Sequence, residues 1–160
     1  TSQRGATLII NDQIDLAFAV EADGVHLGQT DLPLWVARKI LGGRRLIGVS
    51  THTLSEAIEA EREGADYIGV GPIFATKTKT DAREPIGVEA ITEIRQRIQI
   101  PLYAIGGVTY ERLPQIFGAG AHGIATVSGV LGDVRVNVER WISAMSAPGI
   151  KKPFTEDHRK

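Results

Sequence analysis

The sequence predicts an α/β protein of the (β/α)₈ barrel type, with about six of the eight strand–helix units present in this chain. Six short runs that are apolar throughout alternate with six segments of helical periodicity, which is typical of a parallel sheet buried under helices. Polar residues or glycines follow almost every run. A barrel distributes such residues around a ring, whereas the alternative, a doubly wound sheet, gathers them at one switch point.

The predicted strands are parallel and consecutive in one curved sheet. They comprise residues 7–10, 24–27, 45–49, 66–70, 101–105 and 124–127. The last two strands carry the glycines and polar residues expected of barrel strands seven and eight. We therefore number the six as strands three to eight, and expect the first two units, roughly 50 residues, to be absent from this chain.

Local signals place the helices between these strands. Pro33 suits a helix start, with Asp31 before it as a candidate cap, and Thr53 or Ser55 can cap the following helix. Pro114 sits badly inside a helix that would begin at Thr109, so this helix should begin late or irregularly. A last helix runs through Val134, Val138, Trp141 and Ile142. We expect one partial barrel domain at 1–146 and a flexible tail at 147–160.

Composition excludes several classes of function. The chain has 160 residues and a formal net charge of −1, so its overall charge favours neither nucleic acid nor an anionic membrane as a partner. Cysteine is absent, which rules out disulfides, zinc–thiolate sites and cysteine nucleophiles and permits a reducing cytoplasm. No apolar run approaches the ~20 residues that span a bilayer. We expect a cytoplasmic protein, and the sequence leaves its oligomeric state open.

The richest polar loop follows the fourth predicted strand. Thr76, Lys77, Thr78 and Lys79 present two hydroxyls and two ammonium groups within four residues. Hydroxyls can fix the geometry of an anionic ligand while lysines supply charge. The alternative is a solvated loop with ordinary surface lysines.

Glycine and serine follow the last two predicted strands. Gly106 and Gly107 come after one strand, and Val127 and Ser128 come after the next. In barrels, the loops at these two positions commonly bind phosphate through backbone N–H groups. The alternative is that the glycines only form turns between strands and helices.

Two carboxylates follow adjacent strands near the start of the chain. Asp12 and Asp31 can point into the same mouth, and paired carboxylates beside a phosphorylated substrate suggest Mg²⁺. The alternative is that each aspartate caps a helix, and this alternative is stronger for Asp31 than for Asp12. His26 lies inside an apolar strand and is expected to pack in the barrel. His52 lies in a mouth loop and forms no zinc motif with the other histidines.

Taken in order, these segments resemble the thiamine phosphate synthase family from about Ala6 to Met145. The matching segments are residues 8–12, 23–31, 48–53, 66–74, 76–79, 104–108 and 127–128. The resemblance implies a (β/α)₈ barrel enzyme in thiamine biosynthesis. Such a transferase joins 4-amino-2-methyl-5-hydroxymethylpyrimidine diphosphate to thiazole phosphate and releases pyrophosphate.

The resemblance also implies a role for each matching residue. Asn11, Ser50 and Lys79 would hold the pyrimidine diphosphate, and Ser50 and Lys79 would be the catalytic residues. Asp12 and Asp31 would bind Mg²⁺ that bridges to this diphosphate. Two further groups would serve the thiazole phosphate: Thr76, Lys77 and Thr78 at its border, and Gly107, Val127 and Ser128 on its phosphate.

One family feature is missing from this chain. A Gln-x-Arg-x-Lys-type motif on the second strand of the family grips the pyrimidine diphosphate, and no such motif occurs here. Two alternatives therefore remain beside the synthase. One is a thiazole tautomerase, an isomerase on the same barrel that needs neither the Mg²⁺ pair nor Lys79. The other is a non-catalytic barrel fragment that binds phosphate ligands.

Overall fold

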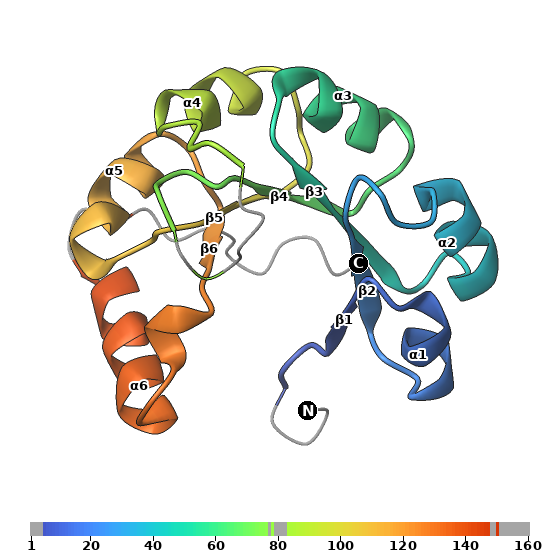
Figure 1. The fold of residues 1–160 in the computed structure, drawn as a ribbon, viewed down its shortest axis with the longest axis horizontal. Coiled ribbons are helices and arrows are strands. Elements are labelled where there is room, and N and C mark those ends of the chain that lie inside the picture. The colour runs from blue at the N-terminus through green and yellow to red at the C-terminus, as the bar shows by residue number, and fades with distance from the viewer. Residues whose placement is uncertain (1–4, 77, 79–82, 148–149, 151–160) are drawn as a thin grey trace.

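The computed structural model describes residues 5–76, 78, 83–147 and 150. Its elements alternate strand and helix along the chain (Figure 1). The strands are β1 (Ile9–Asn11), β2 (Gly24–Leu27), β3 (Leu46–Thr51), β4 (Tyr67–Val70), β5 (Leu102–Ile105) and β6 (Gly123–Ala125). The α-helices are α1 (Ile14–Ala19), α2 (Leu34–Leu41), α3 (Leu54–Arg62), α4 (Glu89–Arg95), α5 (Leu113–Gly118) and α6 (Val134–Met145). Among the described residues there are also the 3₁₀ turns η2 (Tyr110–Arg112) and η3 (Ser128–Val130).

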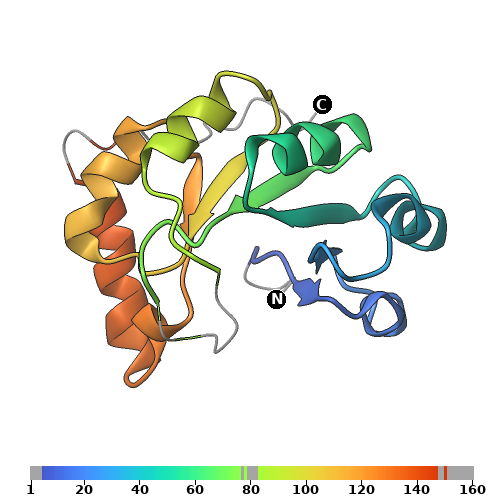
Figure 2. The same cartoon turned by 45° about the horizontal axis from the view of Figure 1, so that its top comes forward.

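The strands form one sheet in chain order, and every neighbouring pair is parallel. The helices run as an arc around the outer side of the sheet from α1 to α6 and do not close into a ring (Figure 1). Figure 2 shows α3 and α4 over the outer side of the central strands. The architecture is a six-stranded half-barrel, which confirms the predicted parallel order.

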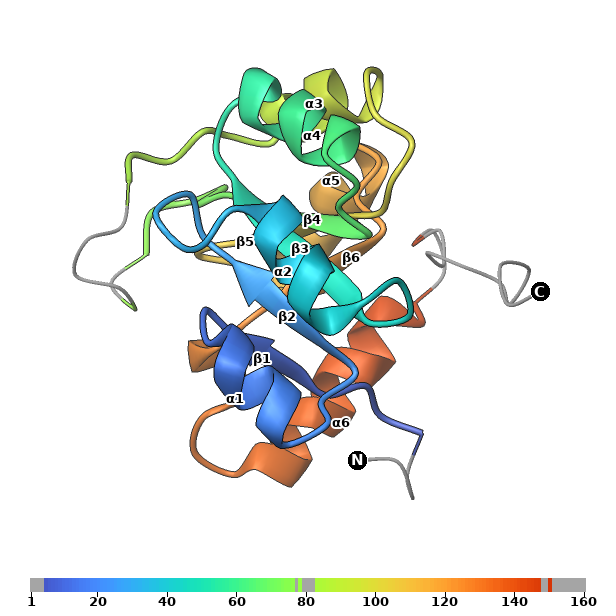
Figure 3. The same ribbon diagram turned by 90° about the vertical axis from the view of Figure 1, so that its right-hand side faces the viewer.

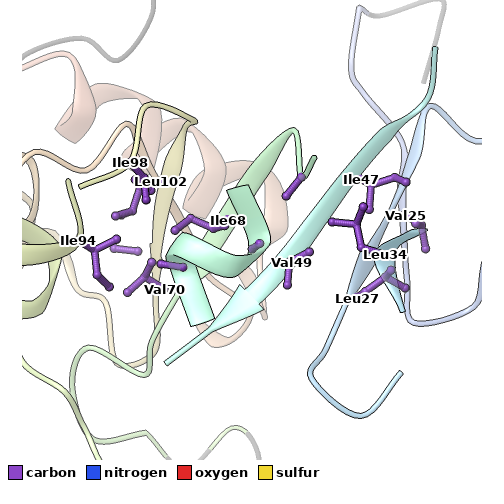
Figure 4. Packing of buried hydrophobic residues seen from close by; sticks show 14 of the residues in the cluster. Val25, Leu27, Leu34, Ile47, Val49, Ile68, Val70, Ile94, Ile98 and Leu102 are labelled. Atoms are coloured by element: carbon purple, nitrogen blue, oxygen red, sulfur yellow. The ribbon is translucent and has the colours of Figure 1, made fainter. Parts of the chain in front are cut away.

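Apolar side chains fill the layer between sheet and helices. Val25, Ile47, Ile68 and Leu102 each present no exposed surface, and Ile94 of α4 is 1% exposed (Figure 4). Successive strand residues point to opposite faces, so every second side chain enters this layer. Within each strand, the apolar side chains that point outward pack under the helices, and the alternate side chains form the inner face of the half-barrel.

Aromatic and small residues occupy the inner face. The rings of His26 and Tyr67 lie 5.5 Å apart, and Tyr67 meets Tyr103 edge-on at the same distance. Gly48 makes room for this row, because a Cβ on it would lie 2.1 Å from Cζ of Tyr67. His26 therefore packs inside the half-barrel, as its place in an apolar strand predicts.

Helix boundaries match the local signals in two cases and differ in one. Thr53 caps α3 in a capping box with Glu56, and the Pro114 region starts late, as the turn η2 followed by α5. The predicted cap at Asp31 is wrong, since Pro33 occupies the N-cap position of α2 without a side-chain hydrogen bond. The Asp31 carboxylate instead accepts the Gly28 N–H at 2.6 Å.

The two ends of the arc expose apolar side chains. Phe18 of α1 is 56% exposed, while Val134 and Ile142 of α6 are each 56% exposed and only Trp141 is buried in that helix. Both helices lie on the same side of the molecule (Figure 3). Most of the predicted tail at 147–160 lies outside the described residues, so that prediction stands as made.

Candidate active site

The ends of the parallel strands surround one large cavity, which we call the mouth cavity. It has a volume of about 390 Å³ and is lined from five successive strands. Its lining includes Gln29 and Thr30 after β2, Ser50 and His52 from β3 and its loop, Thr76 and Thr78 after β4, Gly106, Gly107 and Val108 after β5, and Val127 and Ser128 after β6. Carboxyl ends of strands meet at one edge of a parallel sheet, which is where α/β enzymes place their ligands.

Most of the predicted substrate residues lie in this cavity. The six that line it are Ser50, Thr76, Thr78, Gly107, Val127 and Ser128. Asn11, Asp12 and Asp31 do not line it. Lys77 and Lys79 lie outside the described residues, so their predicted roles stand as made.

Ser50 is held by a chain of hydrogen bonds from the inner face of the half-barrel. Its Oγ lies 2.9 Å from Nε2 of His26, and Nδ1 of the same ring lies 3.1 Å from the Tyr67 hydroxyl. Burial first, and then Tyr103 and Asp66, raises the pKa of Tyr67 to about 12, so this phenol stays protonated at neutral pH. A neutral phenol cannot stabilise an imidazolium as a triad carboxylate does, so the chain orients Ser50 rather than activating it as a nucleophile.

The sequence did not identify His26 and Tyr67 as site residues, although His26 hydrogen-bonds to Ser50 and Tyr67 hydrogen-bonds to His26. Alternation along β2 is the signal that could have found His26. Val25 and Leu27 point outward into the core, so the residue between them points inward, toward strands β3 and β4. Gln29 was also missed, and its Nε2 donates to the Ser50 carbonyl at 2.7 Å.

The loops after β4 and β5 are joined by backbone contacts. Ile73 N–H donates to the Ile105 carbonyl at 2.9 Å and Phe74 N–H to the Gly106 carbonyl at 3.1 Å. Gly107 has φ of +61°, and a Cβ there would lie 2.6 Å from the Ala75 carbonyl oxygen. Only glycine fits at this position, because the backbone is left-handed and the neighbouring loop is too close.

The polar loop after β4 begins with an ordered hydroxyl pair. Thr76 Oγ1 accepts the Thr78 N–H at 3.2 Å and lies at the same distance from Thr78 Oγ1. Both threonines line the mouth cavity. The two hydroxyls that the sequence places in this loop therefore lie together at the cavity, while the two lysines lie outside the described residues.

Glu56 links the loop after β3 to Arg83, which follows the polar loop in sequence. Its carboxylate accepts the His52 and Thr53 N–H groups and pairs with Arg83 at 3.2 Å. Burial raises the pKa of Glu56, but the hydrogen bonds from His52, Arg83 and Thr53 outweigh it and hold the pKa below 4.5. Glu56 is thus a carboxylate at neutral pH and fixes Arg83, which lines the mouth cavity.

The two predicted metal ligands lie beside the cavity rather than in it. Asp31 borders a separate hollow of about 210 Å³, the acidic hollow, which also contains Glu56, Glu59 and Glu63. Asp12 follows β1 with φ of +65°, and its N–H donates to the His26 carbonyl at 2.8 Å. Within the described ranges, no group of three or more acidic, histidine or cysteine residues could hold a metal ion by itself.

A curved sheet of parallel strands that opens into a polar cavity at its carboxyl edge defines a half-barrel of the (β/α) barrel class. The family model for thiamine monophosphate synthase matches residues 1–130. The chain therefore belongs to the thiamine monophosphate synthase family. In the described part of the chain, no helix is long and apolar enough to cross a membrane.

Individual relatives agree with the family model. The chain is 53% identical over 131 residues to thiamine-phosphate synthase of Chloroflexus aurantiacus, covering 82% of this chain and 60% of that protein. It is 51% identical over 132 residues to the same enzyme of Moorella thermoacetica, covering 82% and 63%. The structure matches thiamine phosphate pyrophosphorylase from Pyrococcus furiosus with a TM-score of 0.82 and 40% identity, over 90% of this chain and 69% of that one. The chain thus spans about three fifths of these two synthases.

Proposed function

We propose that the whole protein is a thiamine phosphate synthase. It would condense 4-amino-2-methyl-5-hydroxymethylpyrimidine diphosphate with thiazole phosphate, giving thiamine phosphate and pyrophosphate. The observation that carries this proposal is the convergence of six predicted substrate residues, from four strand ends, on one cavity. Membership of the family supports the same reaction.

In this proposal the half-barrel is part of a closed eight-stranded barrel. Strands β1–β6 would be strands three to eight, and two further strand–helix units would fill the opening between α1 and α6. The exposed apolar residues Phe18, Val134 and Ile142 support such packing. The added units would also bring a further wall to the mouth cavity, between β1 and β6.

The reaction breaks the bond between the pyrimidine methylene carbon and the diphosphate oxygen. The bonding pair leaves with pyrophosphate, and the lone pair of the thiazole nitrogen forms the new carbon–nitrogen bond. No protein nucleophile is needed. The protein must neutralise the leaving group and keep water from the methylene cation, which favours a deep cavity with hydroxyls and cations at its rim.

The predicted substrate residues receive roles on this basis. Ser50, oriented by His26, would hold the pyrimidine diphosphate together with Asn11 and Lys79. Thr76, Lys77 and Thr78 would border the thiazole phosphate, while the backbone at Gly107, Val127 and Ser128 would bind its phosphate. Lys79 would follow the charge that develops on pyrophosphate, because an ammonium is a compact and mobile cation.

Asp12 and Asp31 would hold Mg²⁺. Their chemistry fits the ion, since Mg²⁺ uses one or two carboxylates and completes its shell with substrate phosphates and water. The Gly28 N–H occupies only one acceptor site on Asp31, and a carboxylate retains capacity for a cation. When bound, the ion would supply charge neutralisation at the diphosphate.

Two matched lysine changes in the full-length protein test the proposal. Lys79→Ala should lower the condensation rate at least about 100-fold, the usual cost of removing a group that stabilises transition-state charge. Affinity for thiazole phosphate alone should stay close to wild type. Lys77→Ala should have a much smaller effect on the rate. The assay measures thiamine phosphate and pyrophosphate formed with Mg²⁺, beside calorimetric titration of thiazole phosphate.

Small and equal losses in the two variants would remove the synthase assignment. Absence of condensation by the wild-type protein, with both substrates and Mg²⁺ present, would do the same. Interconversion of thiazole phosphate isomers without condensation would indicate an isomerase instead.

A further inference from the structure

Arg112 contacts two loops of the candidate active site without lining the mouth cavity. This half-buried residue ends the turn η2. Its Nη1 donates to the Gly107 carbonyl at 2.5 Å, and its guanidinium carbon lies 4.1 Å from the centre of the Phe74 ring. Gly107 belongs to the loop after β5 and Phe74 to the loop after β4. A single planar cation therefore bridges the two loops from outside the cavity.

The two loops that Arg112 links are already in close contact with each other. Phe74 N–H donates to the Gly106 carbonyl, and Gly107 approaches the Ala75 carbonyl so closely that a side chain would not fit. An arginine keeps its charge at any working pH, and its plane can stack on a ring while its edge donates. Both contacts of Arg112 thus hold the Gly107 loop at a fixed distance from the loop that carries Thr76 and Thr78.

The bond to Gly107 also sets the direction of a peptide group. In a planar trans peptide, the C=O and the following N–H point in opposite directions. Because Arg112 holds the Gly107 carbonyl, the N–H of Val108 points away from the guanidinium. Gly107 and Val108 both line the mouth cavity, and no residue of the described chain accepts a hydrogen bond from either N–H.

We propose that Arg112 is a positioning residue for phosphate: it fixes the Gly107–Val108 peptide and the adjoining Phe74 loop so that two backbone N–H groups are preset for a phosphate monoester. The guanidinium would act through the peptide and would not touch the ligand. Its charge on the carbonyl also polarises the peptide and strengthens the N–H as a donor. This inference rests on the proposed function, because it deepens the phosphate site of the same cavity.

The test uses the full-length protein and inorganic phosphate as the probe. Arg112→Met keeps the length and apolar stem of the side chain but removes the charge and the donor. Arg95→Met is the matched control, since Arg95 of α4 is also half-buried and donates to a backbone carbonyl, that of Ile98, at 2.5 Å. Arg95 does not line the mouth cavity. The measurements are the phosphate Kd by calorimetry, with thiazole phosphate as competitor, and steady-state kinetics for both substrates.

Arg112→Met should raise the phosphate Kd and the KM for thiazole phosphate by about tenfold, as when an outer partner of a ligand-binding group is removed. The kcat and the KM for the pyrimidine diphosphate should stay within about twofold, because uniform binding is lost rather than transition-state stabilisation. Arg112→Lys should recover part of the affinity, since an ammonium can donate to Gly107 but stacks less well on Phe74. Arg95→Met should leave every ligand constant at its wild-type value.

Two outcomes would overturn the proposal. One is a phosphate Kd in Arg112→Met equal to that in Arg95→Met, and the other is no competition between phosphate and thiazole phosphate in the wild-type protein. The result is separable from the proposed function. Weaker phosphate binding in Arg112→Met without any condensation by wild type would end the synthase assignment and keep the role of Arg112. Condensation with unchanged phosphate binding would do the reverse.

Discussion

The two sides of the half-barrel mouth differ in how completely their strand ends form a site. On the side of β3 to β6, Ser50, Thr76, Gly107 and Ser128 face one cavity, and their loops are tied together by backbone hydrogen bonds. On the side of β1 and β2, Asn11 and the carboxylates Asp12 and Asp31 lie outside that cavity. Both sides carry the residue types that the family resemblance assigns to substrate or metal.

Part of the difference follows from the position of β1 at one edge of the curved sheet. A loop in the middle of the sheet has neighbours on both sides, so its polar groups meet those of the next strands. The loops after the edge strands β1 and β6 each have a neighbour on one side only. Val127 and Ser128 after β6 line the cavity even so, as do Gln29 and Thr30 after β2, whereas Asn11 and Asp12 at the end of β1 do not. Residues there can complete a site only when another wall stands opposite them. The β1 and β2 side should therefore depend on the rest of the barrel for its function.

The largest expected effect tests directly whether the carboxylates on the β1 and β2 side take part in the reaction. Asp12→Asn and Asp31→Asn in the full-length protein should each lower Mg²⁺-dependent turnover by an amount equal to ~2–4 kcal/mol of transition-state stabilisation. The physical reason is loss of a carboxylate from the ion that neutralises pyrophosphate. Turnover against Mg²⁺ concentration measures the effect.

Asp15→Asn is the control for these two changes, because Asp15 is an exposed residue in the first turn of α1 and, among the described residues, only its neighbour Leu16 donates a hydrogen bond to it. Its turnover should match wild type. If Asp12→Asn and Asp31→Asn matched wild type as well, the β1 and β2 side would have no catalytic role.

A second change tests the side that already forms a cavity. Gly107→Ala places a Cβ 2.6 Å from the Ala75 carbonyl oxygen in a left-handed backbone position, so the two loops must separate. We expect a loss of about 2 kcal/mol or more in binding of thiazole phosphate, in line with the cost of strained backbone. Calorimetric titration of thiazole phosphate measures it.

Gly118→Ala is the matched control. Gly118 ends α5, and nothing lies within 4 Å of a Cβ built there. Alanine at this helical position should leave ligand affinity unchanged and add up to about 1 kcal/mol of stability. Equal ligand affinity in the two variants would mean that the glycine loop does not bind the phosphate.

The third prediction concerns Ser50, which lies where the two sides of the mouth meet. Ser50→Ala removes the hydroxyl that pairs with His26 and should weaken binding of the pyrimidine diphosphate by about 1 kcal/mol, the net worth of an ordinary hydrogen bond. Tyr67→Phe breaks the hydrogen bond between the Tyr67 hydroxyl and His26 and keeps the aromatic row, so its effect should be smaller. A larger effect of Tyr67→Phe than of Ser50→Ala, measured by KM, would contradict this order.

The sequence was enough to predict the parallel strand order because each run is mainly apolar, and this pattern can be recognised without any knowledge of contacts. It was less informative about single positions. His26 reads as core until its neighbours Val25 and Leu27 are seen to point outward, which leaves it facing Tyr67 and Ser50.

Asp31 shows a second limit. An aspartate two residues before a proline at a helix start predicts a cap, yet a carboxylate can also accept the Gly28 N–H within its own loop. Sequence does not rank these two bonds, which use the same atoms over similar distances along the chain. Val134 and Ile142 show a third limit, since a helical pattern identifies an apolar face but not the element that covers it.

The smallest expected effect concerns Glu56, a charged residue that lines both the mouth cavity and the acidic hollow. Hydrogen bonds from His52, Arg83 and Thr53 outweigh the effect of burial and hold its pKa below the ordinary value of 4.5. A carboxyl group with a lowered folded-state pKa stabilises the fold above its unfolded-state pKa, and this contribution is lost as the pH falls through the folded-state value. Stability that depends on the charge of Glu56 should therefore be present in full well above pH 4.5, begin to fall near that pH and be lost as the pH drops through the lower folded-state pKa.

Glu56→Gln should lower the free energy of unfolding at pH 7 by about 1 kcal/mol, because the amide still accepts one N–H but loses its charge-assisted bonds. Toward pH 3, below the unfolded-state pKa, the difference from wild type should shrink, as shown by urea unfolding at each pH. Glu59→Gln is the control: it breaks only the exposed pair with Arg62, 3.0 Å apart, so it should cost less at every pH. A difference between Glu56→Gln and wild type that stayed constant with pH would mean that Glu56 acts by packing. The position of Glu56 between the mouth cavity and the acidic hollow would then not depend on the charge of its carboxylate.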